Sequence, residues 1–361
     1  MATVWLTAIW SRSSCWAEQP GDTRPASRRP TLGYVDRQLI DTFGRVHRDL
    51  RISVTDRCNF RCTYCMPADG LEWLPREELL TFEEIERVAR LMVERHGVDS
   101  IRLTGGEPTV RANLTTLVGM LADLPVDLTM TTNGVTLRAL AGKLAAAGLT
   151  RINISLDSLH AERFAELTRR DNLESVLDGI DAAIEAGLDP VKVNVVVMRG
   201  VNDDEIVDLA RFGRDRGVEV RFIEFMPLDA DRSWSDGAVV GCDEIVARIA
   251  EAFPVEPVDR TSAPATRYRY LDGGGFFGVV ASVTRSFCDT CDRIRLTADG
   301  QFRNCLFAVE EFDLRSLLRS GASDDELSEM LQGAVAAKWA GHGISSVDFI
   351  RPNRSMSQIG G

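Results

Sequence analysis

Two groups of closely spaced cysteines are the residues best suited to chemistry in this sequence. Cys58, Cys62 and Cys65 form the first group, with C-x3-C-x2-C spacing. Three thiolates on one loop can bind three irons of a 4Fe–4S cluster and leave the fourth iron open to a ligand. Structural zinc usually takes four ligands in paired C-x2-C motifs, and no histidine neighbours this group. The spacing therefore favours an iron–sulfur cluster over zinc.

A second triplet follows near the C-terminus, where Cys288, Cys291 and Cys305 have C-x2-C-x13-C spacing. The alternative interpretation is a zinc ribbon, with Asp289 or Asp292 replacing a missing fourth cysteine. The four histidines of the chain are all distant in sequence. Three cysteines and an open site again favour a 4Fe–4S cluster.

Composition narrows the class of protein. The chain has 361 residues, 44% of them hydrophobic, and a formal net charge of −12. An acidic chain is a poor candidate for nucleic-acid binding, and no apolar stretch is long enough to predict a membrane span. A disulfide framework suits small secreted domains, so we expect reduced cysteines in a cytoplasmic protein. Cys15 and Cys242 belong to neither triplet, and we interpret them as one exposed residue and one small core or surface residue.

Six β-rich segments alternate with helical patterns over the first two thirds of the chain. The predicted strands are Leu50–Val54, Ile101–Thr104, Leu128–Thr131, Ile152–Leu156, Val191–Val197 and Val220–Phe225. Thr81 with Glu84 predicts a capped helix start, and Asn202 with Glu205 predicts another. Repeated βα units indicate an α/β protein with a partial (β/α)6 TIM-type barrel.

Three segments divide the chain. Residues 1–34 are expected to form a disordered extension, 35–229 the barrel core, and 230–361 a smaller α+β region with the second cluster. In that last region we predict a helix over Glu244–Phe253, a hairpin, and helices over Leu314–Arg319 and Asp324–Ala337. The RSMSQIGG tail shows no periodicity.

The carboxyl ends of parallel barrel strands meet at one face, where chemistry gathers. Five chemistry-bearing segments follow predicted strands: Thr55–Cys65, Gly105–Glu107, Thr132–Gly134, Ser155–Asp157 and Phe225–Pro227. Arginines also lie at or near strands, and an acidic protein needs such local cations to bind a phosphorylated ligand. Arg293 and Arg295 are two residues apart, so on a strand they share one face.

The first triplet, together with the Gly-Gly-Glu-Pro sequence at 105–108, resembles the radical S-adenosylmethionine (SAM) superfamily. From about Val35 onward the chain is similar to the GTP 3′,8-cyclase family within it. The matching motifs are DTFGR at Asp41–Arg45, RLTGGEP, TTNG, ISLDS, RFIEFMP, the second triplet and the terminal Gly-Gly. The long N-terminal extension departs from the family pattern without touching a motif.

The resemblance implies a role for each matching residue. Cys58, Cys62 and Cys65 would bind the SAM-binding cluster, and Cys288, Cys291 and Cys305 a cluster on the substrate side. The implied SAM contacts are Tyr64, Gly106, Ser155 and Met226. The implied GTP contacts are Arg51, Arg102, Thr131, Lys192, Arg293, Ile294 and Arg295, with Arg221 and Ser158 as companions and Thr132 as an alternative to Thr131. Gly360 and Gly361 would enter the barrel and contribute to catalysis.

The implied reaction converts GTP into (8S)-3′,8-cyclo-7,8-dihydroguanosine 5′-triphosphate, the first step of molybdenum cofactor biosynthesis. Reductive cleavage of SAM would start it, hydrogen would leave C3′ of the ribose, and the ring would close on C8 of guanine. The resemblance also implies an electron donor and cyclic pyranopterin monophosphate synthase as the downstream enzyme. The chain would be a monomer or a homodimer. The alternatives are a peptide-modifying radical SAM enzyme with an auxiliary cluster and a zinc-stabilised binding module.

Overall fold

The computed structural model describes residues 37–229, 232–258, 263–344 and 349–360. The expectation for residues 1–34 therefore lies outside the described residues, as do Cys15 and Gly361. The described residues all belong to one compact unit. No described helix is long and apolar enough to cross a membrane.

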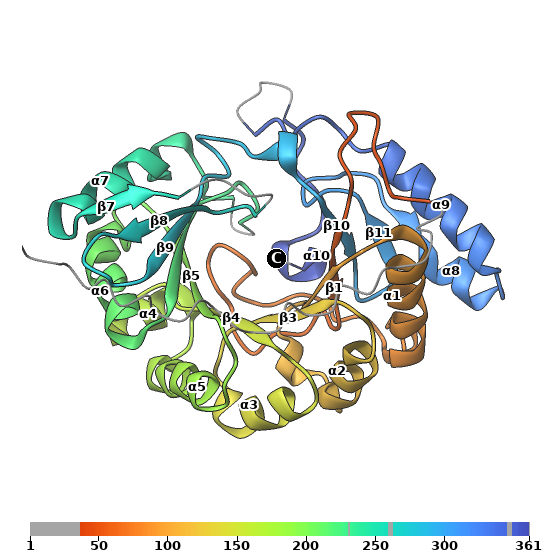
Figure 1. The fold of residues 1–361 in the computed structure, drawn as a ribbon, viewed down its shortest axis with the longest axis horizontal. Coiled ribbons are helices and arrows are strands. Elements are labelled where there is room, and N and C mark those ends of the chain that lie inside the picture. Colours follow the sequence, from red (N-terminus) through yellow and green to blue (C-terminus); the bar gives the residue numbers. More distant parts are fainter. Residues whose placement is uncertain (1–36, 230–231, 259–262, 345–348, 361) are drawn as a thin grey trace, which may run out of the picture. The chain divides into compact units, whose positions relative to one another are not determined.

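One curved sheet of twelve strands organises this unit (Figure 1). Its order is β12-β11-β10-β1-β2-β3-β4-β5-β6-β9-β8-β7. The first six strands are β1 (Asp49–Ser53), β2 (Ser100–Thr104), β3 (Asp127–Thr132), β4 (Arg151–Ser155), β5 (Val191–Val197) and β6 (Glu219–Glu224). The other six are β7 (Val255–Pro257), β8 (Thr266–Tyr270), β9 (Phe276–Val280), β10 (Arg293–Leu296), β11 (Gln301–Arg303) and β12 (Phe312–Asp313). All six predicted strands are confirmed within one or two residues.

The segment after residue 229 extends this sheet at both edges. Strand β10 pairs parallel with β1, and β9 pairs parallel with β6. Beyond them, β11 and β12 continue one edge in antiparallel fashion, while β8 and β7 continue the other. The predicted hairpin is the β8–β9 pair. The second cysteine triplet thereby lies beside the first strand of the sheet, although more than 200 residues separate the two in sequence.

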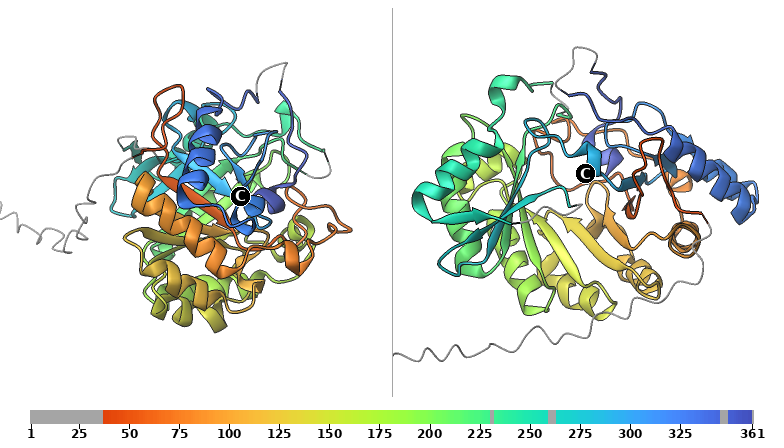
Figure 2. Two further views of the ribbon diagram at one scale, coloured as in Figure 1. Left: turned by 90° about the vertical axis from the view of Figure 1, so that its right-hand side faces the viewer. Right: turned by 45° about the horizontal axis from the view of Figure 1, so that its top comes forward.

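Helices cover the outer side of the curved sheet, and a short helix lies inside it (Figures 1 and 2). They are α1 (Phe82–His96), α2 (Leu114–Ala122), α3 (Leu137–Ala146), α4 (Ala161–Thr168), α5 (Leu173–Glu185), α6 (Ile206–Arg216), α7 (Cys242–Ala252), α8 (Leu314–Arg319), α9 (Asp324–Ala336) and α10 (Met356–Ile359). The inner helix is α10, in the tail for which no periodicity was found. A four-residue helix is about one turn, too short to show an apolar stripe.

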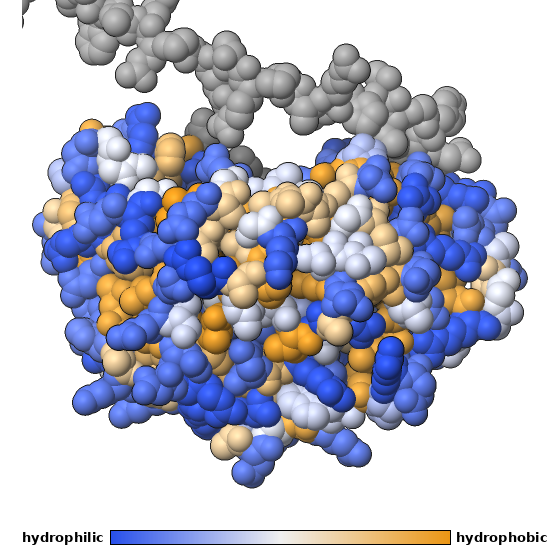
Figure 3. All heavy atoms as spheres, turned by 90° about the horizontal axis from the view of Figure 1, so that it is seen from below, coloured by the Kyte–Doolittle hydropathy of each residue, from blue (hydrophilic) through white to orange (hydrophobic). Residues whose placement is uncertain are grey.

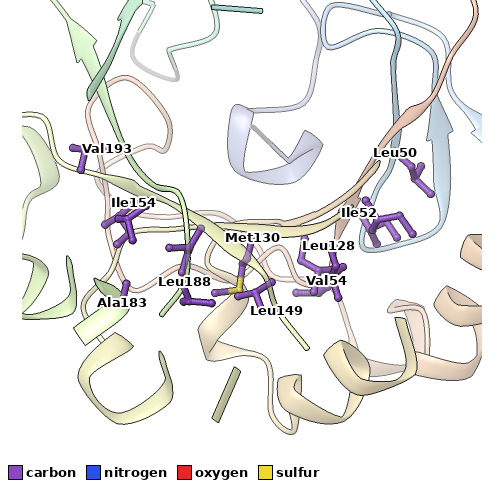
Figure 4. Close-up of a cluster of buried hydrophobic side chains, with 14 of the residues drawn as sticks. Leu50, Ile52, Val54, Leu128, Met130, Leu149, Ile154, Ala183, Leu188 and Val193 are labelled. Carbon is purple, nitrogen blue, oxygen red and sulfur yellow. The ribbon is translucent and has the colours of Figure 1, made fainter. Parts of the chain in front are cut away.

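The apolar core lies between the sheet and its outer helices (Figure 4). Leu50 and Ile52 of β1 point outward with Met130 of β3 and Ile154 of β4, and each is 0% exposed. Because side chains alternate along a strand, the residues between them point to the inner face. On β1 these are Asp49, Arg51 and Ser53, so polar side chains of this strand face the interior of the curved sheet. On the solvent side, seen in Figure 3, hydrophilic side chains lie between smaller apolar patches.

The two predicted helix starts have different outcomes. Thr81 and Glu84 form the capping box at the start of α1. A helical segment does begin directly after Asn202 and continues into α6, but the predicted capping is wrong, because neither the Asn202 nor the Glu205 side chain caps a helix. Asn202 instead bonds the backbone at the end of β5, and Glu205 accepts hydrogen bonds from Ser158 Oγ (2.7 Å) and Leu159 N (2.7 Å). Tertiary partners thus replace the local cap.

Candidate active site

The loop after β1 carries the first cysteine triplet into a cavity at the carboxyl ends of the parallel strands. Cys58, Cys62 and Cys65 all line this cavity. Burial raises the pKa of the Cys58 thiol to about 11 and that of Cys65 to about 12, and it raises the pKa of Cys62 well above its usual value. Thiols in such surroundings become thiolates when a metal supplies positive charge. The donor set therefore fits an iron–sulfur cluster.

The second triplet lines the same cavity from the opposite edge of the parallel strands. Cys288 and Cys291 precede β10, and Cys305 follows β11. Burial raises the pKa of the Cys291 thiol, but Arg293 and Lys338 outweigh it and lower that pKa to about 7. Within the described ranges, no three His, Cys, Asp or Glu side chains form a site for a single metal ion. Both triplets are instead spread around one cavity, an arrangement that fits multi-iron clusters whose thiolates bind different irons.

The Gly-Gly-Glu-Pro segment after β2 packs backbone to backbone against the loop after β1. A Cβ atom on Gly105, whose φ is +142°, would lie 2.4 Å from the Thr55 carbonyl oxygen. One on Gly106 would lie 2.4 Å from the Arg57 carbonyl oxygen. Both positions therefore require glycine. The Gly106 amide donates to Thr55 O (2.9 Å), so Gly106 offers a ligand its carbonyl rather than its amide.

Glu107 of the same segment ties β2 to β3. Its buried carboxylate accepts hydrogen bonds from Thr132 Oγ1 (2.6 Å) and Asn133 N (2.6 Å). Burial is the main influence on this carboxyl group and raises its pKa. Thr131 and Thr132 both line the cavity, but the Thr132 hydroxyl is already bonded to Glu107. The geometry therefore favours Thr131 as the threonine available to a ligand.

Tyr64 is held by Asp157, whose segment the sequence analysis named without giving this residue a role. Its hydroxyl donates to Asp157 Oδ2 at 2.5 Å, and Asp157 Oδ1 accepts from Val196 N at 2.8 Å. Burial raises the pKa of Asp157 to about 6. Ser155 and Met226, the other predicted SAM contacts, also line the cavity. Asp157 belongs to the ISLDS motif, so its place directly after β4 was the available signal.

Strand register places three arginines in a row across the inner face of the sheet. Arg295 of β10 pairs with Arg51 of β1, which pairs with Arg102 of β2. We call these three residues the arginine row. All three line the cavity, and the Nε atoms of Arg51 and Arg102 are buried without a hydrogen-bond partner among the described residues. Burial, and then the charge of Arg51, lowers the pKa of Arg102 to about 9. Three neighbouring guanidinium groups on one cavity wall favour a polyanionic ligand.

Two further predicted cations, Lys192 and Arg221, share one carboxylate. Glu219 Oε1 lies 3.7 Å from Lys192 Nζ and 2.9 Å from Arg221 Nε, and Glu219 also pairs with Arg267 (2.9 Å). Arg221 lines the cavity, whereas Lys192 is not among its lining residues. The companion Ser158 lies away from the cavity, bonded to Glu205. Glu219 was not predicted; its spacing of two residues from Arg221 on β6 was the available signal, whereas Lys192 and Arg267 come from other strands.

Arg293 and Ile294 take opposite faces of β10. Arg293 lines the cavity, and its Nη2 lies 3.2 Å from Cys291 Sγ while its guanidinium stacks over Phe287. The Ile294 side chain is 0% exposed in the hydrophobic core. It does not line the cavity, so any contact of Ile294 with a ligand there would involve its backbone.

The C-terminal tail lies inside the curved sheet through α10 (Figure 1). Ser357 donates hydrogen bonds to Cys65 from its backbone amide and its hydroxyl, which lowers the pKa of that thiol against the larger effect of burial. The Gly360 carbonyl accepts a hydrogen bond from Arg295 Nη1. A Cβ atom on Gly360, whose φ is +83°, would lie 2.2 Å from Ser53 Oγ. The tail thus touches both the first triplet and the arginine row.

Comparisons with known proteins agree with this geometry. The Radical SAM superfamily model matches residues 52–213, and the Molybdenum Cofactor Synthesis C model matches residues 218–344. Among solved structures, Streptococcus suis SuiB bound to S-adenosylmethionine has a TM-score of 0.56 at 14% identity, covering 81% of this chain and 69% of that one. The AdoMet-bound structure of anSMEcpe also gives 0.56, at 11% identity, covering 82% of this chain and 79% of that one. These likenesses show the fold, an α/β radical SAM fold.

Curated relatives are much more similar in sequence. A protein named GTP 3′,8-cyclase from Corynebacterium glutamicum is 50% identical over 339 residues, covering 90% of each chain. One from Rhodopirellula baltica is 51% identical over 330 residues, covering 90% of this chain and 92% of the relative. GTP 3′,8-cyclase 2 of Mycobacterium tuberculosis is 49% identical over 353 residues, covering 93% and 98%. The chain therefore belongs to the GTP 3′,8-cyclase family of the radical SAM superfamily.

Proposed function

We propose that this chain converts GTP into (8S)-3′,8-cyclo-7,8-dihydroguanosine 5′-triphosphate, the first step of molybdenum cofactor biosynthesis. The observation that carries this proposal is that one cavity gathers both cysteine triplets and the arginine row. A redox cofactor site beside three neighbouring arginines suits a radical reaction on a polyphosphate. The names of the relatives agree with this chemistry.

Membership of the radical SAM superfamily implies a 4Fe–4S cluster and SAM. Cys58, Cys62 and Cys65 would hold the cluster, and the loops that contain Tyr64 and Gly106 would hold SAM beside it. When bound, this pair supplies the means to remove a hydrogen atom from an unactivated carbon. The chain's own residues position the cofactor: Asp157 fixes the Tyr64 ring, and the two glycines bring the loops together.

A second 4Fe–4S cluster on Cys288, Cys291 and Cys305 is part of the proposal. With three protein ligands, one iron would stay open toward the cavity, where it could take a donor atom of the purine. The arginine row would bind the triphosphate, with Arg221 and Arg293 at its sides. With its phosphates on the arginine row and its base at the second triplet, GTP would have its ribose between the two triplets. We interpret the curved sheet that surrounds them as the partial (β/α)6 barrel of radical SAM enzymes.

The chain needs no general acid or base for hydrogen abstraction. Its work is to bind, orient and exclude water. Gly360, bonded to Arg295 and packed on Ser53, would bring the tail to the arginine row and narrow the cavity. The proposal further includes an electron donor, cyclic pyranopterin monophosphate synthase as the enzyme that takes the product, and a cytoplasmic setting.

Anaerobic reconstitution tests this function. The full chain, incubated with iron, sulfide, SAM, GTP and dithionite, should bind about eight irons and form 5′-deoxyadenosine together with a cyclic GTP isomer. The matched controls are the same protein with ATP and the Cys62→Ser variant with GTP, and neither should yield that isomer. Formation of 5′-deoxyadenosine without any GTP-derived product would contradict the proposed substrate.

A further inference from the structure

The Asp41–Arg45 motif of the sequence analysis has no role in the proposed function. In the structure it forms a buried cluster behind the second cysteine triplet. Asp41 Oδ2 lies 2.5 Å from Arg45 Nε and 3.1 Å from His47 Nε2, and the side chains of Asp41 and His47 are 0% exposed. Arg45 Nη1 donates to the Cys288 carbonyl oxygen at 2.8 Å. The motif therefore supports the loop that carries two cysteines of the triplet.

Lys338, two residues beyond α9, joins this cluster to a cysteine sulfur. Its Nζ lies 2.8 Å from the Arg293 carbonyl oxygen, 3.3 Å from His47 Nδ1 and 3.7 Å from Cys291 Sγ. An ammonium group has three N–H donors, and the carbonyl oxygen, the imidazole nitrogen and the sulfur are three acceptors for them. The residue is 4% exposed, so water has little access to the charge.

The hydrogen-bond directions in this cluster follow from Lys338. An ammonium cannot accept a hydrogen bond, so His47 Nδ1 must accept from it. The His47 ring is then neutral, with its hydrogen on Nε2, from which it donates to Asp41 Oδ2. Because the imidazole separates Asp41 from Lys338, the carboxylate orients the ring without pairing directly with the ammonium. The positive charge of Lys338 is left facing Cys291.

The choice of lysine is itself informative. The chain has three lysines, Lys143, Lys192 and Lys338, while all its other basic side chains except histidine are arginines. A guanidinium is a planar fork, whereas an ammonium directs three donors to three separate acceptors around a point charge. The three acceptors around residue 338 match an ammonium and not a guanidinium.

We propose that Lys338 is a positioning residue for the second triplet: its ammonium group lies against Cys291 and favours the reduced state of the cluster bound there. The inference rests on the second cluster of the proposed function. Hydrogen bonds and charges at cluster sulfurs set the reduction potential, and a nearby cation stabilises the extra electron. Asp41 and His47 keep the ammonium in place.

Arg293 also reaches Cys291, at 3.2 Å, but the two cations differ in where they lie. Arg293 lines the cavity, so a bound triphosphate can compete for it. Lys338 is not among the lining residues and contacts the sulfur from the Asp41–His47 side. Its charge on Cys291 is therefore independent of the substrate.

The test isolates the second cluster in the full chain. Replacing Cys58, Cys62 and Cys65 by serine removes the first site, and this triple-serine chain is the reference. After anaerobic reconstitution, its midpoint potential is measured by a redox titration followed by electron paramagnetic resonance, and iron loss is timed with a chelator. Lys338→Met should shift the potential to more negative values and speed iron loss. Lys143→Met, which removes a charge from an exposed position on α3, should change neither.

Two variants of His47 distinguish the effect of its hydrogen bonds, which position Lys338, from the effect of a change in packing. In His47→Gln the amide can still accept from Lys338 and donate to Asp41, so the potential should stay close to that of the reference. His47→Leu removes both bonds and should shift the potential in the same direction as Lys338→Met. If Lys338→Met does not fold, His47→Leu against His47→Gln decides the question.

The outcomes distinguish the two claims. A reference chain that binds no iron overturns the second cluster and, with it, the role of Lys338. If the reference chain binds a cluster and its potential is unchanged in Lys338→Met, the role of Lys338 is overturned while the proposed function stands. Where Lys338→Met does not fold, an unchanged potential in both histidine variants overturns that role in the same way.

Discussion

Replacing Arg102 by methionine should stabilise the ligand-free protein and weaken its affinity for a triphosphate. The pKa of Arg102 falls from its usual value, by roughly three to four units, to about 9, first because of burial and then because of Arg51. At about 1.36 kcal/mol per pKa unit, this corresponds to roughly 5 kcal/mol of unfavourable interaction in the charged form. The neighbouring charges persist in the variant, so we expect a gain of about 1–3 kcal/mol in the free energy of unfolding.

The pH dependence has a defined sign. Between pH 9 and 12 the unfolded chain binds more protons at Arg102 than the folded chain, so stability rises with pH in that window. Below pH 9 the full penalty is present. The stabilisation by Arg102→Met should therefore be complete at neutral pH and should shrink as the pH rises above 9.

Thermal unfolding of the ligand-free chain, with and without inorganic triphosphate, measures both effects. Inorganic triphosphate contains no guanine, so its binding tests the arginine row separately from any contact between the base and a cluster. Wild-type protein should be stabilised by triphosphate, whereas Arg102→Met should unfold at a higher temperature alone and bind the anion roughly 10- to 100-fold more weakly. The control is Arg138→Met, an exposed arginine paired with Asp178 and Glu185, which should leave triphosphate binding unchanged. A destabilised Arg102→Met variant that still binds triphosphate would refute the reasoning.

Three further outcomes are expected. Cys62→Ser should abolish SAM cleavage, whereas Cys291→Ser should keep cleavage and lose the cyclic product; wild-type product formation by Cys291→Ser would rule out the second cluster. Gly360→Val places a side chain where Cβ alone would lie 2.2 Å from Ser53 Oγ, so product formation should fall at least about tenfold while iron content stays constant, and full activity would mean that the tail only frays. Burial raises the pKa of Asp157 to about 6, so between about pH 4 and 6 the folded chain binds more protons at this residue than the unfolded chain, and stability falls as the pH rises. Asp157→Asn should remove this fall, and a pH profile of thermal unfolding that does not change would exclude this carboxyl group as its cause.

The sequence alone predicted the elements and the cofactor chemistry. Apolar runs such as Val191–Val197 form strands at the predicted places. A strand that is buried on one or both faces shows this in the order of apolar and polar residues, and a few residues of sequence are enough to reveal it. The spacing of Cys58, Cys62 and Cys65 is likewise local, and one loop carries all three. Strands β1 to β6 are neighbours in the sheet in the same order as in the chain, because βα connections place successive strands side by side.

Other features of the site come from register and long-range packing. The arginine row exists because Arg295 of β10 pairs with Arg51 of β1, and neither segment by itself encodes that pairing. The same holds for Glu219, whose partners come from three strands.

Only the tertiary structure decided how the isolated motifs act together. The tail has no periodicity, yet α10 lies inside the sheet because Arg295 and the first-triplet loop provide partners for its backbone. The Asp41–Arg45 motif acquires a role only when Lys338, almost 300 residues later, meets His47 and Cys291. The physical reason is the same in each case. Hydrophobic periodicity and ligand spacing are properties of a short segment, whereas the compensation of a buried charge depends on which distant groups the fold places within a few ångströms of it.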